Sequence, residues 1–262
     1  NFGAVRTADF HGSIVAVKQL TTSGDSDVHK YIRREISMLK GLHHPNIVQF
    51  MGMCEHSSGL YLVMEFIEQG DLSRLLRGKA VLTWQQRVRM AIDAAAAMVF
   101  VHSRNLIHRD LKSANYLVTE TQKLKLCDLG FARKIESACP EQQMRHKKAM
   151  TMCGTDDWMA PEVALGMPYD GSADVFSFGI VLQEMILRKL PKPRAPQTAF
   201  EFNVPAFLAL LPNTCPAPLS KLCVACTMYN PKERPTFKQA HAELKQQLQD
   251  MVSNSDEARP PA

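Results

Sequence analysis

Three oxygen-bearing side chains lie on two nearby segments in the middle of the chain. Asp110 and Asn115 belong to one polar segment, residues 108–115, and Asp128 follows a short apolar run thirteen residues after Asn115. An Asp, an Asn and a second Asp on adjacent loops offer hard oxygen ligands, which suit Mg²⁺ better than zinc. Each segment alone is typical of a solvated turn, but their combination at these separations predicts a magnesium site.

Two charged residues, Lys18 and Glu35, stand where the surrounding pattern is apolar. Lys18 ends a β-branched run at 14–17, and Glu35 falls on the apolar stripe of a predicted helix at 28–39. A buried charge is costly unless an opposite charge meets it, which makes Lys18 the candidate partner of Glu35. The alternative is that Glu35 lies at the edge of the stripe and reaches water.

The elements that must position these residues change in character at residues 68–71. Before this point, apolar runs predict strands at 14–17 and 60–67, with the predicted helix between them. After it, Thr83 can cap a long helix whose apolar positions run from 84 to 98. Further helices are predicted at 172–188, 217–229 and 236–251. We therefore expect a small sheet-rich part followed by a larger helical part.

The composition is that of an ordinary globular protein. The 262 residues are 45% hydrophobic and 22% charged, which excludes a disordered or fibrous chain. The net charge of +5 comes from scattered basic residues, so we expect no nucleic-acid partner. No apolar run approaches the roughly 20 residues that a membrane span needs, and the first residues lack the apolar core of a signal peptide.

The seven cysteines do not have the spacing of a disulfide framework. We interpret them as reduced thiols and expect a cytoplasmic protein. Cys215, Cys223 and Cys226 leave two interpretations open, a zinc site or small residues in a helical core. The second is favoured because no second Cys pair or His stands nearby at finger spacing.

Taken together, the motifs resemble those of the eukaryotic protein kinase catalytic domain. The matching segments are Val15–Lys18, Glu35, His108–Asn115, Asp128–Gly130 and Ala160–Glu162. The resemblance runs from Gly3 to about residue 250. It implies an α+β, bilobal fold with a small β-rich N-lobe at 1–69, a larger and mainly α-helical C-lobe at 70–252, and a flexible tail at 253–262.

For the reaction itself, the resemblance assigns roles to the polar residues of the two central segments. Asp110 would accept or orient the proton of the substrate hydroxyl, and Lys112 would steady the transferred phosphoryl group. Asn115 and Asp128 would hold Mg²⁺ against the phosphates of ATP. Positioning and charge neutralisation would carry the rate, with little covalent work for the protein.

The resemblance also implies a nucleotide site. Lys18, positioned by Glu35, would contact the α- and β-phosphates, and Met64 would guard the deeper part of the pocket. The remaining residues of this site would form its roof and floor or offer backbone groups to the adenine: Gly3, Val5, Ala16, Leu117, Glu65 and Ile67.

The implied substrate is a protein with a Ser or Thr hydroxyl. Lys112 in the catalytic segment, residues 108–115, is similar to the residue of serine/threonine kinases, and Thr155 points the same way. Two alternatives stay open, a nucleotide-binding pseudokinase that acts as a scaffold and a dual-specificity kinase. The presence of every expected charged residue argues against the pseudokinase.

A finer resemblance links residues 174–179 and 234–237 to the tyrosine-kinase-like group of serine/threonine kinases. In that group Asp174 would brace the catalytic loop and Arg234 would pair with Glu162. A weaker similarity to LIM kinases and their testis-specific relatives is opposed by the catalytic loop, where Lys replaces their Asn.

The sequence departs from the family pattern in two places. Residues 1–5 match only the second half of the glycine-rich loop, so we expect the chain to be a fragment of a longer protein. Leu129 replaces the usual Phe of the metal-binding triplet and should still fill an apolar slot. Thr151 follows a basic stretch, which makes it the expected target of an upstream activating kinase.

Overall fold

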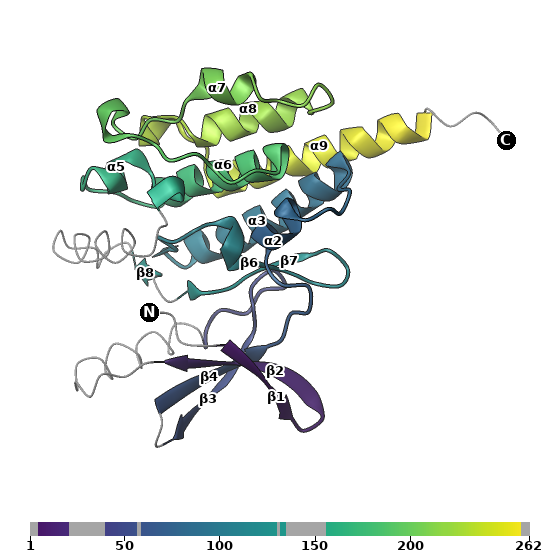
Figure 1. The fold of residues 1–262 in the computed structure, drawn as a ribbon, viewed down its shortest axis with the longest axis vertical. Coiled ribbons are helices and arrows are strands. Elements are labelled where there is room, and N and C mark those ends of the chain that lie inside the picture. Colours follow the sequence, from purple (N-terminus) through teal and green to yellow (C-terminus); the bar gives the residue numbers. More distant parts are fainter. Residues whose placement is uncertain (1–4, 21–39, 57–58, 130–131, 135–155, 258–262) are drawn as a thin grey trace.

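The computed structural model describes residues 5–20, 40–56, 59–129, 132–134 and 156–257. Figure 1 shows a sheet at one end of the molecule and a larger group of helices at the other, with the short strands β6 and β7 at the boundary. The predicted helix at 28–39, with Glu35, lies outside the described residues. So do Gly3 and Thr151.

The sheet contains four antiparallel strands in the order β1-β2-β4-β3. They are β1 (Val5–Phe10), β2 (Ser13–Leu20), β3 (Phe50–His56) and β4 (Gly59–Glu65). The predicted strand at 14–17 lies inside β2, and the one predicted at 60–67 corresponds to β4, which ends two residues earlier. Gly12 allows the tight turn between β1 and β2, because its φ of 83° favours glycine.

The long helix predicted after Thr83 is α3 (Trp84–Ser103). Thr83 and Gln86 form a reciprocal capping box, in which the Thr83 side chain accepts from the Gln86 backbone at 3.2 Å and the Gln86 side chain accepts from the Thr83 backbone at 2.8 Å. Val88, Ala91, Ala95 and Met98 of the predicted apolar stripe are buried and Trp84 is half-buried, although other residues of α3 are buried as well. Helix α9 packs against this helix.

The three later helices are also present, with different ends. They are α6 (Ser172–Leu187), α8 (Ala217–Cys226) and α9 (Phe237–Glu257). Helix α8 ends three residues before the predicted 229, because the Thr227 hydroxyl donates to the carbonyls of Cys223 and Val224 and competes with the helical ladder.

The predicted flexible tail at 253–262 begins within helix α9, and its flexibility stays a prediction. Helix α9 continues to Glu257, because the residues after Met251 include neither Gly nor Pro until Pro260.

Several short elements complete the described chain. The helices are α2 (Leu72–Arg77), α5 (Pro161–Ala164) and α7 (Val204–Leu208), and the strands are β5 (Leu106–Ile107), β6 (Tyr116–Val118), β7 (Leu124–Leu126) and β8 (Arg133–Lys134). The two-stranded pairs β5-β8 and β6-β7 carry the polar segments singled out above.

The main hydrophobic core lies in the helical part. It centres on the buried faces of α3 and α6 and includes the fully buried aromatic side chains of Tyr116, Phe176, Phe178 and Phe237. The sheet has a smaller cluster of Phe50, Leu60 and Leu62. The polar loops at the boundary are therefore anchored mainly by the helices.

The sheet and the helical part are also joined by backbone hydrogen bonds. The N–H of Leu126 in β7 donates to Asn46 at 2.8 Å, and the N–H of Val48 donates to Leu126 at 2.8 Å. Within the described part of the chain, no helix combines the length and apolar character needed to cross a bilayer.

Candidate active site

A cavity of about 300 Å³ lies between the sheet and the helical part. Its lining includes most of the residues assigned to the nucleotide by resemblance: Val5, Ala16, Lys18, Met64, Glu65, Leu117 and Asp128. Ile67 is not in the lining; it is buried beside it, on the segment that joins β4 to α2. Two distant parts of the sequence thus meet around one mostly apolar space, the usual form of a ligand site.

Lys18 and Asp128 face one another across this cavity. The ammonium nitrogen of Lys18 lies 3.0 Å from Oδ1 of Asp128, and both side chains are mostly buried. Lys18 comes from β2 of the sheet, whereas Asp128 follows β7 of the helical part. The predicted partner, Glu35, lies outside the described residues, so that pairing stays a prediction.

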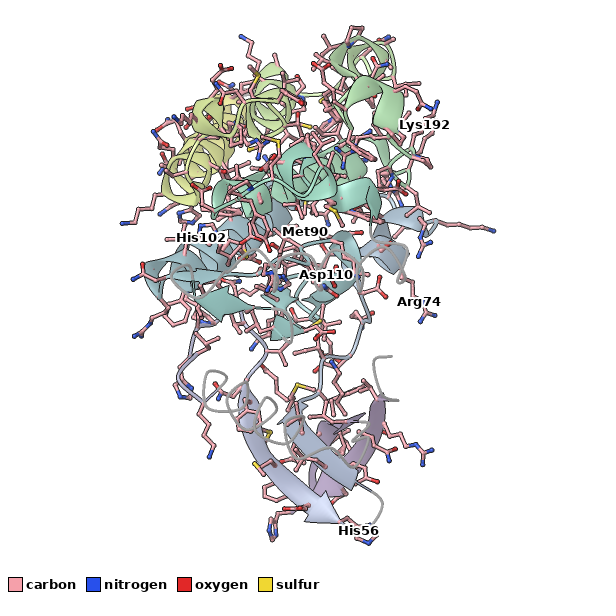
Figure 2. The ribbon with its side chains drawn as sticks, turned by 90° about the vertical axis from the view of Figure 1, so that its left-hand side faces the viewer. His56, Arg74, Met90, His102, Asp110 and Lys192 are labelled. Carbon is pink, nitrogen blue, oxygen red and sulfur yellow. The ribbon has the colours of Figure 1, made fainter. Side chains whose placement is uncertain are left out.

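Asp110 is held by two neighbours from its own loop. Lys112 donates to its two carboxylate oxygens at 3.1 and 2.9 Å. The side-chain nitrogen of Asn115 donates to the Asp110 carbonyl at 2.6 Å and to its carboxylate at 3.2 Å. Figure 2 places Asp110 where the helical part faces the sheet, far from His56 at the sheet's outer end. All three predicted reaction residues therefore form one cluster.

Asn115 also connects this cluster to Asp128. The N–H of Cys127, the residue before Asp128, donates to the Asn115 carbonyl at 2.8 Å. Since the Asn115 amide nitrogen is used on Asp110, its side-chain oxygen is the atom left for a cation. Among the described residues this oxygen accepts no hydrogen bond.

The donor set fits Mg²⁺. It consists of one amide oxygen and one carboxylate, which are hard ligands, and Mg²⁺ commonly takes one or two protein groups and completes its shell with water and phosphate oxygens. Over the described ranges, no group of three or more His, Cys, Asp or Glu side chains could hold a metal. A closed zinc-type site is therefore not what this loop cluster offers.

Asp174, near the start of α6, holds the backbone of the catalytic segment. Its carboxylate accepts from the N–H groups of His108 at 2.8 Å and Arg109 at 2.9 Å, and from the His102 ring at 2.9 Å. Burial raises the pKa of Asp174, but the bond from His102 and the neighbouring imidazoles outweigh it, and the pKa is lowered. The predicted bracing of the loop by Asp174 is confirmed.

The bracing supports a backbone conformation that side chains rarely adopt. Arg109, directly before Asp110, has a φ of 74°, and Asp128 has a φ of 58°. Such left-handed conformations cost on the order of 1–3 kcal/mol each and persist only where neighbouring contacts enforce them. Both strained residues flank the cluster of polar groups, which is where strain commonly serves function.

Glu162 and Arg234 form a buried, bidentate ion pair. The two guanidinium nitrogens donate to the two carboxylate oxygens at 2.6 and 2.9 Å. Arg234 also donates to the carbonyls of Ser172, Met228 and Tyr229, so its remaining protons are satisfied. The predicted pairing is confirmed, and its burial makes it structural rather than a surface contact.

The apolar residues near the site behave as expected. Leu129 is buried in the main core, as its apolar character predicted. Cys127 lines the cavity, and burial raises the pKa of its thiol to about 12, which makes it a poor nucleophile. Cys223 and Cys226 are fully buried on α8, and burial raises the pKa of both thiols, so they are core residues.

Two side chains that sequence reasoning missed also belong to the site. Lys125 of β7 donates to both carboxylate oxygens of Glu65 at 2.7 and 2.8 Å, which links the end of β4 to the helical part. Glu184 of α6 accepts from Ser113 of the catalytic segment. Glu184 could have been noticed as a charge among the apolar residues of 178–187, whereas nothing in the sequence marks the partner of Lys125.

The geometry above can be compared with known proteins. Residues 1–244 match the model of the protein tyrosine and serine/threonine kinase family. This chain belongs to that family. The kinase domain accordingly has the α+β, bilobal fold, with the sheet as the small lobe and the helices as the large lobe.

Relatives from Dictyostelium discoideum agree with this assignment. The kinase domain is 45% identical over 249 residues to a RasGEF domain-containing serine/threonine-protein kinase X, covering 94% of this chain and 25% of that protein. It is 42% identical over 258 residues to a probable serine/threonine-protein kinase, covering 98% of this chain and 42% of the relative. The chain thus spans less than half the length of these curated relatives.

Proposed function

We propose that this domain transfers the γ-phosphoryl group of Mg-ATP to serine or threonine hydroxyls of protein substrates. The observation that carries the proposal is the Asp110 carboxylate, fixed by Lys112 and Asn115 beside a cavity that ends at Asp128. The names of the relatives, all serine/threonine-protein kinases, support the choice of acceptor.

The cavity suits a purine. Ala16 and Leu117 contribute apolar surface from the two lobes, and the side chain of Met64 adds to it. The N–H of Glu65 donates to the Gln49 carbonyl at 3.0 Å, so the group that Glu65 can offer to the adenine is its own carbonyl. Ile67, two residues further along the same segment, would present backbone rather than side chain, since its side chain is buried.

The charged residues suit a polyphosphate with its cation. Lys18 would contact phosphate oxygens, and the side-chain oxygens of Asn115 and Asp128 would hold Mg²⁺. When bound, Mg²⁺ neutralises the charge that develops on the phosphates during transfer. The 3.0 Å contact between Lys18 and Asp128 brings the phosphate-binding group and the metal-binding group to one end of the cavity.

The chemical step needs one positioned base and one cation. Asp110 would orient the acceptor hydroxyl and take its proton as the new oxygen–phosphorus bond forms. The bond between the γ-phosphorus and the bridging oxygen breaks, and that oxygen leaves with ADP. Lys112, already 2.9 Å from Asp110, would balance negative charge on the phosphoryl group in flight.

Three finer predictions rest on the sequence alone. They are the activation by an upstream kinase acting on Thr151, the cytoplasmic location and the place in the tyrosine-kinase-like group. They stay predictions.

The acceptor is tested by phosphoamino-acid analysis of a degenerate peptide library treated with the whole protein and Mg-ATP. We expect phosphoserine and phosphothreonine, and their loss in Lys18→Met. Phosphotyrosine as a major product would favour the dual-specificity alternative. Binding of Mg-ATP with no transfer to any peptide or protein would favour the scaffold.

A further inference from the structure

The buried carboxylate of Glu184, on helix α6, contacts the catalytic segment. Its Oε1 accepts a hydrogen bond of 2.7 Å from the hydroxyl of Ser113, and its Oε2 accepts one of 2.8 Å from the indole nitrogen of Trp158. The side chain is only 2% exposed. One carboxylate therefore joins two segments that are 45 residues apart in the sequence.

Both segments are close to the reaction residues. Ser113 lies between Lys112 and Asn115, the two residues that hold the Asp110 carboxylate, and it is itself fully buried. It begins the short 3₁₀ helix at 113–115, in which the Asn115 N–H donates to the Lys112 carbonyl at 3.0 Å. A shift of Ser113 would therefore move both neighbours of Asp110.

The segment that contains Trp158 is fixed on its other sides. The Trp158 carbonyl accepts from the Ser177 hydroxyl of α6 at 2.8 Å. Arg194 donates to the carbonyls of Asp157 and Met159, and its guanidinium lies 4.7 Å from the ring of Phe176. The Trp158 end of the bridge is thus a fixed point, whereas the Ser113 end belongs to the loop that must be positioned.

Burying a carboxylate at this position costs free energy. Apart from Asp174 and Ser177, the other buried residues of helix α6 are apolar, and in the described part of the chain no Lys, Arg or His forms an ion pair with Glu184. Its two oxygens are matched to two neutral donors. An apolar residue of similar volume would avoid the cost of desolvation but would leave both donors without an acceptor.

We propose that Glu184 is a positioning residue for phosphoryl transfer, which holds the catalytic segment at Ser113 against the fixed segment at Trp158. The proposal rests on the function proposed above, because it needs a phosphoryl transfer to be affected. It predicts that the bridge controls the turnover number more than the affinity for ATP, since Ser113 and Trp158 do not line the nucleotide cavity.

The test compares steady-state kinetics of the whole protein with those of Glu184→Met and Glu184→Gln. Met removes both acceptor oxygens at similar volume, and we expect kcat to fall about 10- to 100-fold with the KM for ATP within about twofold. Gln keeps one acceptor oxygen and gains an N–H donor for the Ser113 oxygen, so it should restore most of kcat. Val181→Ala, which opens a cavity elsewhere in buried α6, is the control for general destabilisation and should keep kcat.

A double-mutant cycle tests the bridge with Glu184 in place. Ser113→Ala and Trp158→Phe each remove one donor, and both act through the same carboxylate. We expect the double variant to lose less kcat than the product of the two single losses. This cycle also decides the case if Glu184→Met does not fold.

The outcomes separate the two proposals. No phosphoryl transfer by the unmodified protein contradicts the proposed function. Normal transfer with kcat unchanged in Glu184→Met overturns the positioning role. Equal losses in Glu184→Met, Glu184→Gln and Val181→Ala also overturn it, because they indicate a general structural role. Additive losses in the Ser113 and Trp158 cycle overturn it as well.

Discussion

Lys18 and Asp128 are 110 residues apart, yet the ammonium of one lies 3.0 Å from the carboxylate of the other. The contact joins the sheet to the helical lobe at the cavity that both residues line. Both residues line a cavity whose other lining residues are mostly apolar, and each charge is matched there by the other. A triphosphate bound with a metal ion suits this pair, because its oxygens can contact the Lys18 ammonium while the metal ion contacts the Asp128 carboxylate.

Replacing Lys18 with Met should remove the cation and keep most of its volume. We expect kcat/KM for ATP to fall by at least about 10²-fold, the usual cost of removing one charged donor from a transition state. The measurement is transfer to a peptide at varied ATP. Lys123→Met, an exposed lysine in the turn before β7, is the matched control and should have no effect. Unchanged kinetics in Lys18→Met would contradict the assignment of the cavity.

Asp174 should matter more for activity than its distance from the cavity suggests. In Asp174→Asn, one of the N–H groups of His108 and Arg109 would face an amide nitrogen instead of an oxygen. We expect a loss of about 1–3 kcal/mol in the free energy of unfolding, measured in urea. We also expect kcat to fall by more than this loss of stability explains, because the backbone of Arg109 relaxes.

The control for this change is Asp170→Asn. Asp170 is exposed and accepts from the backbone N–H of Ser172, a role that Asn fills equally well. A fall in stability without any fall in kcat in Asp174→Asn would mean that Asp174 supports the helical lobe but does not set the loop.

The Glu162 and Arg234 pair should be strongly coupled. Removing either partner leaves the other charge buried and should cost about 3–5 kcal/mol of unfolding free energy. In the double variant Glu162→Met with Arg234→Met, we expect a cost well below the sum of the two single costs. Urea unfolding of the four proteins measures the coupling. Additive costs would show that the ion pair contributes no energy of its own.

Glu184 should make stability depend on pH. Burial raises its pKa to about 7, against the opposing bonds from Trp158 and Ser113 and the charge of Arg77. The folded protein then holds this proton more tightly than the unfolded chain, so protonated Glu184 stabilises the fold by about 3 kcal/mol below about pH 4.5. This stabilisation is lost as the pH rises through 7.

The prediction is tested by measuring the free energy of unfolding from pH 5 to pH 8 for the unmodified protein and Glu184→Gln. Gln cannot ionise, so the variant should gain stability relative to the unmodified protein as pH rises. The difference between the two proteins removes the contribution of His44 and His241, whose pKa values burial lowers. A constant difference across this range would contradict the raised pKa.

Local patterns were sufficient to predict the elements that carry the site. The β-branched run at 14–17 and the capping residue Thr83 mark real elements, because strand propensity and capping act over a few residues. The sequence did not predict that α9 extends past residue 251, because Ser253, Asn254 and Ser255 are weak helix formers, yet no Gly or Pro interrupts the helix before Glu257.

Contacts between distant segments could be predicted only where a motif resemblance supplied them. The pairing of Arg234 with Glu162 and the bracing by Asp174 came from that source and are confirmed. The bonds from Lys125 to Glu65 and from Ser113 to Glu184 could not be predicted. Periodicity indicates which face of a helix or strand a residue lies on, but it does not identify the distant residue that contacts it.

The most direct test of the account is phosphoryl transfer from Mg-ATP by the whole protein beside its Asp110→Asn variant. Asn keeps the shape of Asp110 but cannot take a proton, and the change does not alter the residues Lys18, Asn115 and Asp128 themselves. We predict that the unmodified protein phosphorylates a protein substrate, whereas the variant still binds Mg-ATP but transfers phosphate at least about 10²-fold more slowly. Equal transfer by the two proteins would contradict the role of Asp110 and with it the central claim.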